Sequence, residues 1–257
     1  MGKVVRLLPA MGGDVYWQMA FDEALLVLRD AGVIGDTLRF YWMEPSAVTI
    51  GYFQSLGDVV DVEAAYGFGF DVTRRISGGG AVFHDSAGEI VYCITVSRSL
   101  LGDVGVEESF RVLGEGVVRA VKLMGLEASF EGVNDVVVAG RKVSGQAQAR
   151  RPGAVLQHGT LLYATNLSLM EKVLKPPAKL REKGAGRLSE RVATISMLLG
   201  HRVGRYEALR AMVKGFEDAL GDLLGAELVE SEASRRELEL ARSLYWKYVN
   251  PLWVSLR

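Results

Sequence analysis

The stretch that most constrains this chain is residues 74–85, which read Arg-Arg-Ile-Ser-Gly-Gly-Gly-Ala-Val-Phe-His-Asp. Because glycine has no Cβ, a run of glycines lets the backbone adopt positive φ and bring its N–H groups close to a ligand. The adjacent Arg74 and Arg75 offer planar forks of donors that suit phosphate or carboxylate. We therefore predict a site for an anionic small molecule. The alternative is a glycine-rich turn between two strands with solvated arginines; the His84–Asp85 pair favours the site.

Hydrophobic spacing elsewhere predicts helices mixed with runs of adjacent strands. Asp14 can cap a helix whose apolar residues recur at helical spacing, namely Trp17, Ala20, Phe21, Ala24, Leu25 and Leu28. A second amphipathic helix is expected over Phe110–Met124, although Gly114 and Gly116 weaken it. A last helix is expected from Ser231, as its cap, to Tyr248. Because helices and strand runs alternate irregularly, we expect an α+β fold, with mixed or antiparallel sheets flanked by helices, and a single domain over residues 1–257.

A hairpin is predicted over residues 134–145, with a two-residue turn at Ala139-Gly140. Lys142 follows this turn, and strand alternation places its side chain on the opposite face of the strand from that of Val143. Its neighbours Ser144 and Gly145 are small, which leaves room for a substrate. An exposed hairpin lysine is usually only solvated, so the residues alone leave both interpretations of Lys142 open.

Composition excludes several classes of protein. The chain has 257 residues, 24% charged residues and a net charge of −1, which does not favour binding to nucleic acid or to an acidic membrane. No apolar run reaches the length of a membrane span, and the first residues contain no signal-peptide core. The single cysteine, Cys93, excludes an intrachain disulfide or a cysteine-based zinc cluster. We expect a cytoplasmic protein in which Cys93 is a core residue.

Three segments together resemble the lipoate–protein ligase family, in the superfamily that also holds biotin ligases and octanoyltransferases. They are Arg74–Asp85, the segment Asn134-Asp135 to Gly140-Arg141-Lys142-Val143-Ser144-Gly145, and Gln157-His158-Gly159-Thr160. The resemblance extends from about Arg6 to Val192. It implies a biotin/lipoate ligase-like catalytic domain that activates lipoate with ATP and Mg²⁺ to lipoyl-AMP. The lipoyl group would then pass to a lysine of a lipoyl-domain protein, either a 2-oxoacid dehydrogenase acyltransferase or the glycine-cleavage H protein.

The resemblance also implies the roles of individual residues. Lys142 is the expected catalytic residue, contacting the lipoate carbonyl and the α-phosphate. Asp135 is the candidate magnesium ligand, because carboxylates suit that hard cation, although an Asx turn explains it equally well. The roles of His84 and His158 in proton transfer stay open. Substrate- and nucleotide-binding positions are expected at Arg74, Arg75, Ser77, Gly78, Gly79, Gly80, Ala81, Val82, His84, Asn134, Asp135, Ser144, Gly145, Ala147, His158, Gly159 and Thr160.

Two other functions stay open. Gly145-Gln146-Ala147-Gln148 and Leu156-Gln157-His158-Gly159 look as much like octanoyltransferases, which take the acyl group from an octanoyl-carrier protein through a cysteine nucleophile. The resemblance places that cysteine near residues 128–131 in one transferase family and near Pro176-Pro177 in another, and this sequence has no cysteine at either place. ATP-dependent ligation is therefore favoured. The third possibility is a non-catalytic module that binds a lipoyl carrier.

The larger bacterial ligases of the family continue into a C-terminal accessory domain, for which residues up to Arg257 leave no room. In this respect the sequence resembles the short archaeal-type ligase, whose accessory domain is a separate polypeptide. We therefore expect a separate accessory subunit as a partner.

Overall fold

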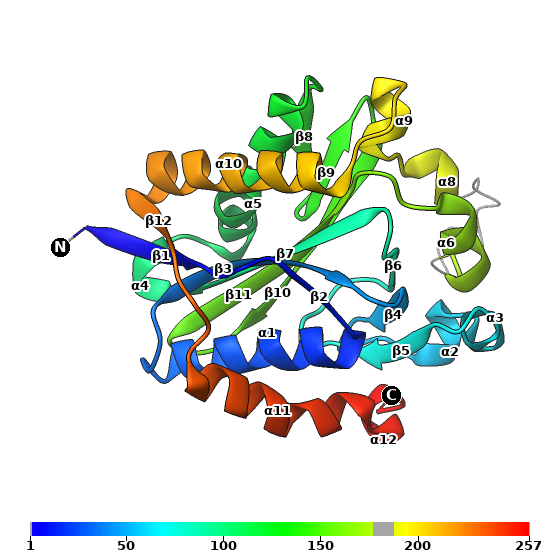
Figure 1. Ribbon diagram of the computed structural model, residues 1–257, viewed down its shortest axis with the longest axis horizontal. Coiled ribbons are helices and arrows are strands. Elements are labelled where there is room, and N and C mark those ends of the chain that lie inside the picture. Colours follow the sequence, from blue (N-terminus) through cyan, green and yellow to red (C-terminus); the bar gives the residue numbers. More distant parts are fainter. Residues whose placement is uncertain (1, 177–187, 257) are drawn as a thin grey trace.

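The computed structural model describes residues 2–176 and 188–256, and over these ranges a large mixed sheet divides two helical layers (Figure 1). Eight of its nine strands follow the order β12–β1–β3–β7–β11–β10–β9–β8, and the ninth, β2, pairs with β3 off this path. The β12–β1, β1–β3 and β2–β3 pairs are parallel, and the pairs from β3 to β8 are antiparallel. The strands are β1 Lys3–Leu7, β2 Met11–Gly13, β3 Asp36–Met43, β7 Glu89–Ser97, β8 Ala128–Glu131, β9 Asp135–Val138, β10 Arg141–Arg150, β11 Ala154–Leu162 and β12 Ala226–Glu230.

A small second sheet carries the glycine stretch. In it β4 (Ala47–Ile50) lies between β5 (Asp71–Arg74), which is parallel to it, and β6 (Val82–His84), which is antiparallel. Residues 75–81 connect β5 to β6 and so pass the end of β4, where Gly51 follows. A Cβ on Gly51 would lie 2.1 Å from the carbonyl oxygen of Gly79. The glycine loop, residues 75–81, therefore needs glycine at position 51 for its close crossing.

Helices cover both faces of the large sheet (Figure 1). On one face α1 (Val15–Asp30) packs with α11 (Arg235–Val249), and on the other α5 (Val106–Leu123) packs with α10 (Arg205–Leu224). The shorter helices are α2 Leu56–Val59, α3 Val62–Gly67, α4 Arg98–Leu101, α6 Leu167–Val173, α8 Leu188–Arg191, α9 Ile195–Leu199 and α12 Pro251–Val254. Among the helices of residues 2–176 and 188–256, none is both long and apolar enough to cross a membrane.

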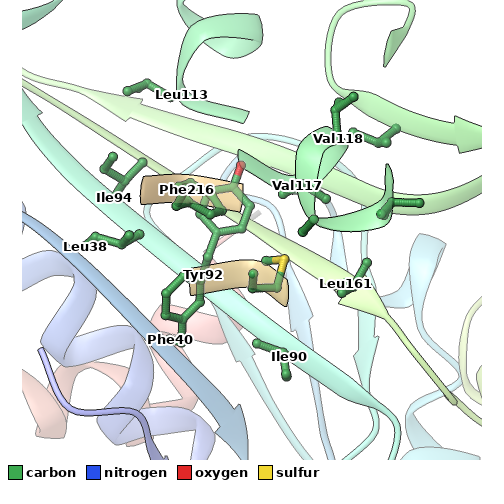
Figure 2. Close-up of a cluster of buried hydrophobic side chains, with 14 of the residues drawn as sticks. Leu38, Phe40, Ile90, Tyr92, Ile94, Leu113, Val117, Val118, Leu161 and Phe216 are labelled. Atoms are coloured by element: carbon green, nitrogen blue, oxygen red, sulfur yellow. The ribbon is translucent and has the colours of Figure 1, made fainter. Parts of the chain in front are cut away.

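The main core lies between the sheet and the α5–α10 pair (Figure 2). The ring of Phe216 on α10 lies 5.6 Å from that of Phe40 on β3 and 4.8 Å from that of Tyr92 on β7, between ring centroids. Gly116 on α5 faces the Phe216 ring, which a Cβ there would approach to 2.4 Å. Glycines inside these helices therefore permit a close crossing that larger side chains would block.

The structure confirms the α+β class and several local predictions. Asp14 caps α1 by accepting from the N–H of Trp17, and α5 continues through Gly114 and Gly116. The predicted hairpin turns at Ala139 and Gly140, which have φ of 48° and 74°. The prediction of Ser231 as the last helix's cap was wrong. Ser234 caps α11 instead, because Glu237 completes a reciprocal capping box with it.

Candidate functional site

A cavity of about 450 Å³ lies where the two sheets meet. The glycine loop, β4 and β6 form one wall, and β9, β10 and β11 form another. Helices α6 and α8 contribute Met170 and Arg191. An apolar part of the lining comes from α1, β3 and β7, through Met19, Tyr41 and Val91. The cavity can thus hold an apolar chain beside polar groups.

Arg75 organises the glycine loop from inside the protein. It is only 4% exposed, and its Nη2 donates to the carbonyl oxygens of Gly78 and Gly80 at 2.7 Å each. Because the C=O and N–H of a planar trans peptide point in opposite directions, the N–H groups of Gly79 and Ala81 are turned away from Arg75. Both residues line the cavity. The loop therefore offers backbone donors to an anion.

Two buried chains of hydrogen bonds converge on Arg75. In the first, Asp22 Oδ2 lies 2.8 Å from His158 Nδ1, His158 Nε2 lies 2.6 Å from Ser77 Oγ, and Arg75 Nε donates to that oxygen at 3.1 Å. The second uses Glu89, His84 and Thr49 in the same order. Its distances are 2.6 Å from Glu89 Oε1 to His84 Nδ1, 2.9 Å from His84 Nε2 to Thr49 Oγ1, and 3.2 Å from Arg75 Nη1 to Thr49 Oγ1.

Charge in the first chain is fixed by burial and by Arg39. Burial alone would raise the pKa of Asp22, but the nearby Arg39 guanidinium and the bonds from His158 and Tyr41 lower it below its ordinary value. Burial lowers the pKa of His158. Asp22 is therefore ionised and His158 neutral at pH 7, so Nδ1 of His158 donates to Asp22 and Nε2 accepts from the Ser77 hydroxyl.

Burial also shifts the pKa values of Arg75 and Glu89, in each case toward the neutral form. Burial lowers the pKa of Arg75 to about 10, which still leaves it protonated at pH 7. Burial raises the pKa of Glu89, although His84 opposes the rise. Arg75 thus holds a positive charge against the cavity wall with no carboxylate bonded directly to it in the described residues. This field favours an anionic ligand.

Lys142 stands on the facing wall, where β10 has a bulge between Lys142 and Ser144. Its Nζ lies 2.6 Å from Asp135 Oδ1; both side chains line the cavity and are partly exposed, at 37% and 36%. A Cβ on Gly145 would lie 2.6 Å from Nζ. Glycine at position 145 therefore makes the space in which the ammonium lies.

The structure brings most of the sequence-predicted site residues to this cavity and places four elsewhere. Lining residues are Arg75, Gly79, Gly80, Ala81, Val82, His84, Asn134, Asp135, Lys142, Gly145, Ala147, His158, Gly159 and Thr160. Ser77 and Ser144 are fully buried behind the wall. Gly78 contributes its carbonyl to Arg75. Asn134, although on the wall, donates to the Gln146 carbonyl within the hairpin.

Arg74 has a different role from the predicted anion contact. It is completely buried and donates to the carbonyls of Gly51, Tyr52 and Gln54 after β4. It also donates to the carbonyls of Trp253 and Val254 in α12. Those contacts occupy its guanidinium outside the cavity, so it joins the C-terminal helix to the loop after β4.

A magnesium ion would find one or two carboxylates here. Asp135 and Glu131 both line the cavity, and Mg²⁺ is usually held by one or two carboxylates plus substrate phosphates. In residues 2–176 and 188–256 there is no group of three His, Cys, Asp or Glu side chains that could hold a metal alone. The donor set therefore fits an ion that arrives with a phosphate ligand.

Cys93 lies on β7, fully buried, and is absent from the cavity lining among the described residues. Burial and the nearby Asp22 raise the pKa of its thiol well above the ordinary value. Both features disfavour the thiolate, which is the reactive form of cysteine.

Sequence reasoning missed the residues that support the site from behind. Asp22, Thr49 and Glu89 complete the two hydrogen-bond chains. Their signal in the sequence is weak, because Asp22 is one of several polar residues in α1, and Thr49 and Glu89 lie in mostly apolar strands. A buried polar residue needs a partner, but the sequence does not say which one.

Comparison with known proteins agrees with this architecture. The family model described as the lipoyl protein ligase A/B catalytic domain matches residues 14–217. The octanoyltransferase LipM of Kyrpidia tusciae is 35% identical over 96% of this chain and 97% of its own, and other octanoyltransferases LipM are 31–33% identical.

Two solved structures resemble this chain in both fold and sequence. The bi-partite lipoate protein ligase of Thermoplasma acidophilum, studied with its E2 lipoyl domain, has a TM-score of 0.82 and 32% identity, over 99% of this chain and 96% of that one. A lipoate-protein ligase A bound with ATP has a TM-score of 0.83 and 30% identity, over 100% of both chains.

Proposed function

This chain belongs to the lipoyl protein ligase A/B catalytic domain family, and from that premise we propose that it is an ATP-dependent lipoate–protein ligase. It would join lipoate to AMP and then transfer the lipoyl group to a lysine of a lipoyl-domain protein. The enzyme class, a ligase or acyltransferase of this family, follows from membership; the use of ATP is the proposal.

The lack of a reactive cysteine is the observation that favours ATP-dependent ligation over acyl transfer through a thioester. Transfer from an acyl carrier through an enzyme thioester needs a reactive thiol. The sequence has one cysteine, and Cys93 is fully buried, does not line the cavity and has a raised pKa. The cavity instead offers an ammonium, a backbone anion cradle and the buried cation Arg75. These groups suit an acyl-phosphate intermediate rather than a thioester.

The chemistry would proceed in two displacements. A lipoate carboxylate oxygen attacks the α-phosphorus of ATP, and pyrophosphate leaves. The neutral amine of the acceptor lysine then attacks the acyl carbon, AMP leaves with the electrons of the broken C–O bond, and the amine loses a proton. Lys142 would stabilise the charge that develops in both transition states, which for one such donor contributes roughly 2.7–4 kcal/mol. Asp135 and Glu131 would hold Mg²⁺, which neutralises phosphate charge.

Octanoyltransferase activity is the second candidate, because octanoyltransferases LipM are among the most similar relatives at 31–35% identity. In that reaction an octanoyl group would move from an acyl carrier protein to the acceptor lysine without ATP. Lys142 and the glycine loop could serve the acyl oxygen in the same way. This reading lacks a cysteine at the cavity among the described residues.

One assay separates these functions. The purified chain is incubated with a lipoyl domain, either with lipoate, ATP and Mg²⁺ or with octanoyl-acyl carrier protein alone, and products are read by intact mass. We expect modification of the lipoyl domain and pyrophosphate release only in the first mixture. Modification in the second mixture, or an acyl adduct on Cys93, would establish the transferase instead. Binding of the lipoyl domain without modification in either mixture would indicate a non-catalytic module.

The assay also tests the catalytic lysine and the partner. Lys142→Met should abolish pyrophosphate release, while Lys214→Met, which removes an exposed lysine paired with Asp218, should not. The similar Thermoplasma acidophilum ligase is described as bi-partite. We propose that this chain likewise works with an accessory subunit, so adding such a subunit should raise the rate of lipoyl-AMP formation; an unchanged rate would reject that part.

A further inference from the structure

The buried side chains Ser77, His158 and Asp22 are arranged like the nucleophile, base and carboxylate of a catalytic triad. His158 Nε2 lies 2.6 Å from Ser77 Oγ, and His158 Nδ1 lies 2.8 Å from Asp22 Oδ2. In hydrolases the same order activates a serine for attack on an acyl carbon. Here Ser77 is 0% exposed and does not line the cavity. An acyl carbon in the cavity therefore cannot reach Ser77 Oγ, and the three residues need another role.

The contacts beyond Ser77 show what that role is. Its hydroxyl oxygen accepts from Arg75 Nε at 3.1 Å, and Arg75 Nη2 holds the carbonyls of Gly78 and Gly80. Gly79 between them has φ of +86°, a conformation that glycine adopts readily. The glycine loop thus depends on the position of one guanidinium, which Ser77 holds at Nε and Thr49 holds at Nη1.

We propose that Asp22, His158 and Ser77 are positioning residues, which hold Arg75 and through it the glycine loop in the conformation that binds an anion, and that protonation of His158 releases this hold. Neutral His158 accepts the Ser77 O–H, which leaves a lone pair of Ser77 for Arg75. Protonated His158 becomes a second donor to the same oxygen and sets two cations on it. Arg75 is then displaced, and the N–H groups of Gly79 and Ala81 lose their alignment.

The groups around His158 make its protonation costly. Burial lowers its pKa, and the charges of Arg75 and His84 add to this effect, while Asp22 opposes it. Arg39 and Tyr41 bind Asp22 from β3, and Cys93 is the cross-strand neighbour of His158 on β7. The groups around His158 are therefore Asp22 on α1, Arg39 and Tyr41 on β3, Arg75 in the glycine loop, His84 on β6 and Cys93 on β7. Lys142 on β10 lines the same wall of the cavity as His158.

The test reads the loop directly and concerns the same site as the proposed function. In glycine-selectively ¹⁵N-labelled protein, the amide signals of Gly78 and Gly80 are followed between about pH 8 and 5. Gly78→Ala and Gly80→Ala assign the signals, because a Cβ at either position would meet nothing within 4 Å. In the unaltered chain we expect both signals to shift with the midpoint of the His158 ring. In Ser77→Ala the ring should still titrate while the two glycine signals do not follow.

The activity measurement, which alone rests on the proposed function, completes the design. Ser77→Ala should lower kcat for lipoyl transfer about tenfold or more, with KM for the lipoyl domain unchanged. Ser196→Ala is the matched control, since Ser196 Oγ also makes two hydrogen bonds, to Tyr163 and Val203, outside the cavity lining.

Two results would overturn the proposal whatever reaction the chain catalyses. One is a pair of glycine signals that follows His158 equally in Ser77→Ala. The other is an acyl ester trapped on Ser77, which would make it the nucleophile. If the unaltered chain shows no lipoyl transfer, the proposed function fails, while the glycine signals still decide the positioning role.

Discussion

Arg74 and Arg75 are adjacent and chemically identical, yet they support different parts of the molecule. Arg74 binds backbone carbonyls of α12 and of the segment after β4. Arg75 binds the glycine loop and lines the cavity. Strand alternation predicts that neighbours at the end of β5 face opposite ways. It does not say which of the two faces the cavity, so both were expected to bind an anion.

Gly145 shows a similar dependence at Lys142, the proposed catalytic lysine. Adding a Cβ there places a methyl group 2.6 Å from Lys142 Nζ, and the flexible lysine can yield. We predict that Gly145→Ala keeps its stability but displaces the ammonium from Asp135, which lowers the rate of acyl transfer about 100-fold, as misplacement of a reacting group does. Initial rates with a lipoyl domain and thermal melting measure the two effects.

Gly57→Ala is the control for this prediction, because the same methyl group there meets nothing within 4 Å. It should melt and react like the unaltered chain. A Gly145→Ala variant with normal transfer would show that the position of Lys142 over Gly145 is not the reactive one.

Among the elements, those with strong local patterns could be predicted from the sequence. The capped α1, the amphipathic α5 and the Ala139-Gly140 hairpin each carry their own signal. The start of α11 was misplaced because Ser231 and Ser234 are both good N-cap residues, and only Ser234 has a glutamate three residues later. The pairing of strands could not be predicted, since β12 joins β1 across more than two hundred residues.

The crossing of α5 and α10 depends on glycine in a way that helix propensity misses. A Cβ on Gly215 would lie 2.3 Å from the carbonyl oxygen of Gly116 and 2.6 Å from the N of Ala120. We predict that Gly215→Ala destabilises the fold by about 1–3 kcal/mol, the usual range for overpacking, although alanine favours helices. Urea unfolding gives the free energy.

Gly221→Ala on the same helix supplies the comparison. A Cβ there meets nothing within 4 Å, so only propensity acts, and the variant should gain up to about 1 kcal/mol. Equal effects of the two substitutions would mean that the helices separate without cost.

On the scale of the whole molecule, the site is assembled from segments that no local pattern connects. Asp22 comes from α1, Ser77 from the glycine loop and His158 from β11. The sequence indicates the glycine loop and Lys142 as candidate site elements, because each lies in a continuous motif. It cannot indicate the carboxylates behind the histidines, because a carboxylate in a helix or strand can pair with many partners. Tertiary packing alone selects them.

This assembly predicts how stability depends on pH. Folding lowers the pKa of His158 below its ordinary 6.5, mainly by burial. Near and below pH 6.5, His158 therefore binds a proton more readily in the unfolded chain than in the folded chain. The free energy of unfolding should therefore fall as pH decreases through this range. Asp22 adds a later loss. Burial opposes the shift, but Arg39, His158 and Tyr41 lower its pKa below 3.8, so its contribution is present above that pH and lost as pH falls further.

Thermal melting between about pH 8 and 5 measures the first effect, with His158→Gln as the comparison because glutamine does not titrate. The variant starts from a lower melting temperature, since Asp22 and Ser77 lose a partner, but its melting temperature should depend less on pH below about 6.5. His84 and His201 are present in both proteins, so the difference between the two slopes reports His158. Parallel slopes would mean that His158 binds its proton equally well in the folded and unfolded chains, and the buried chain from Asp22 to Arg75 would not set the acid stability of the protein.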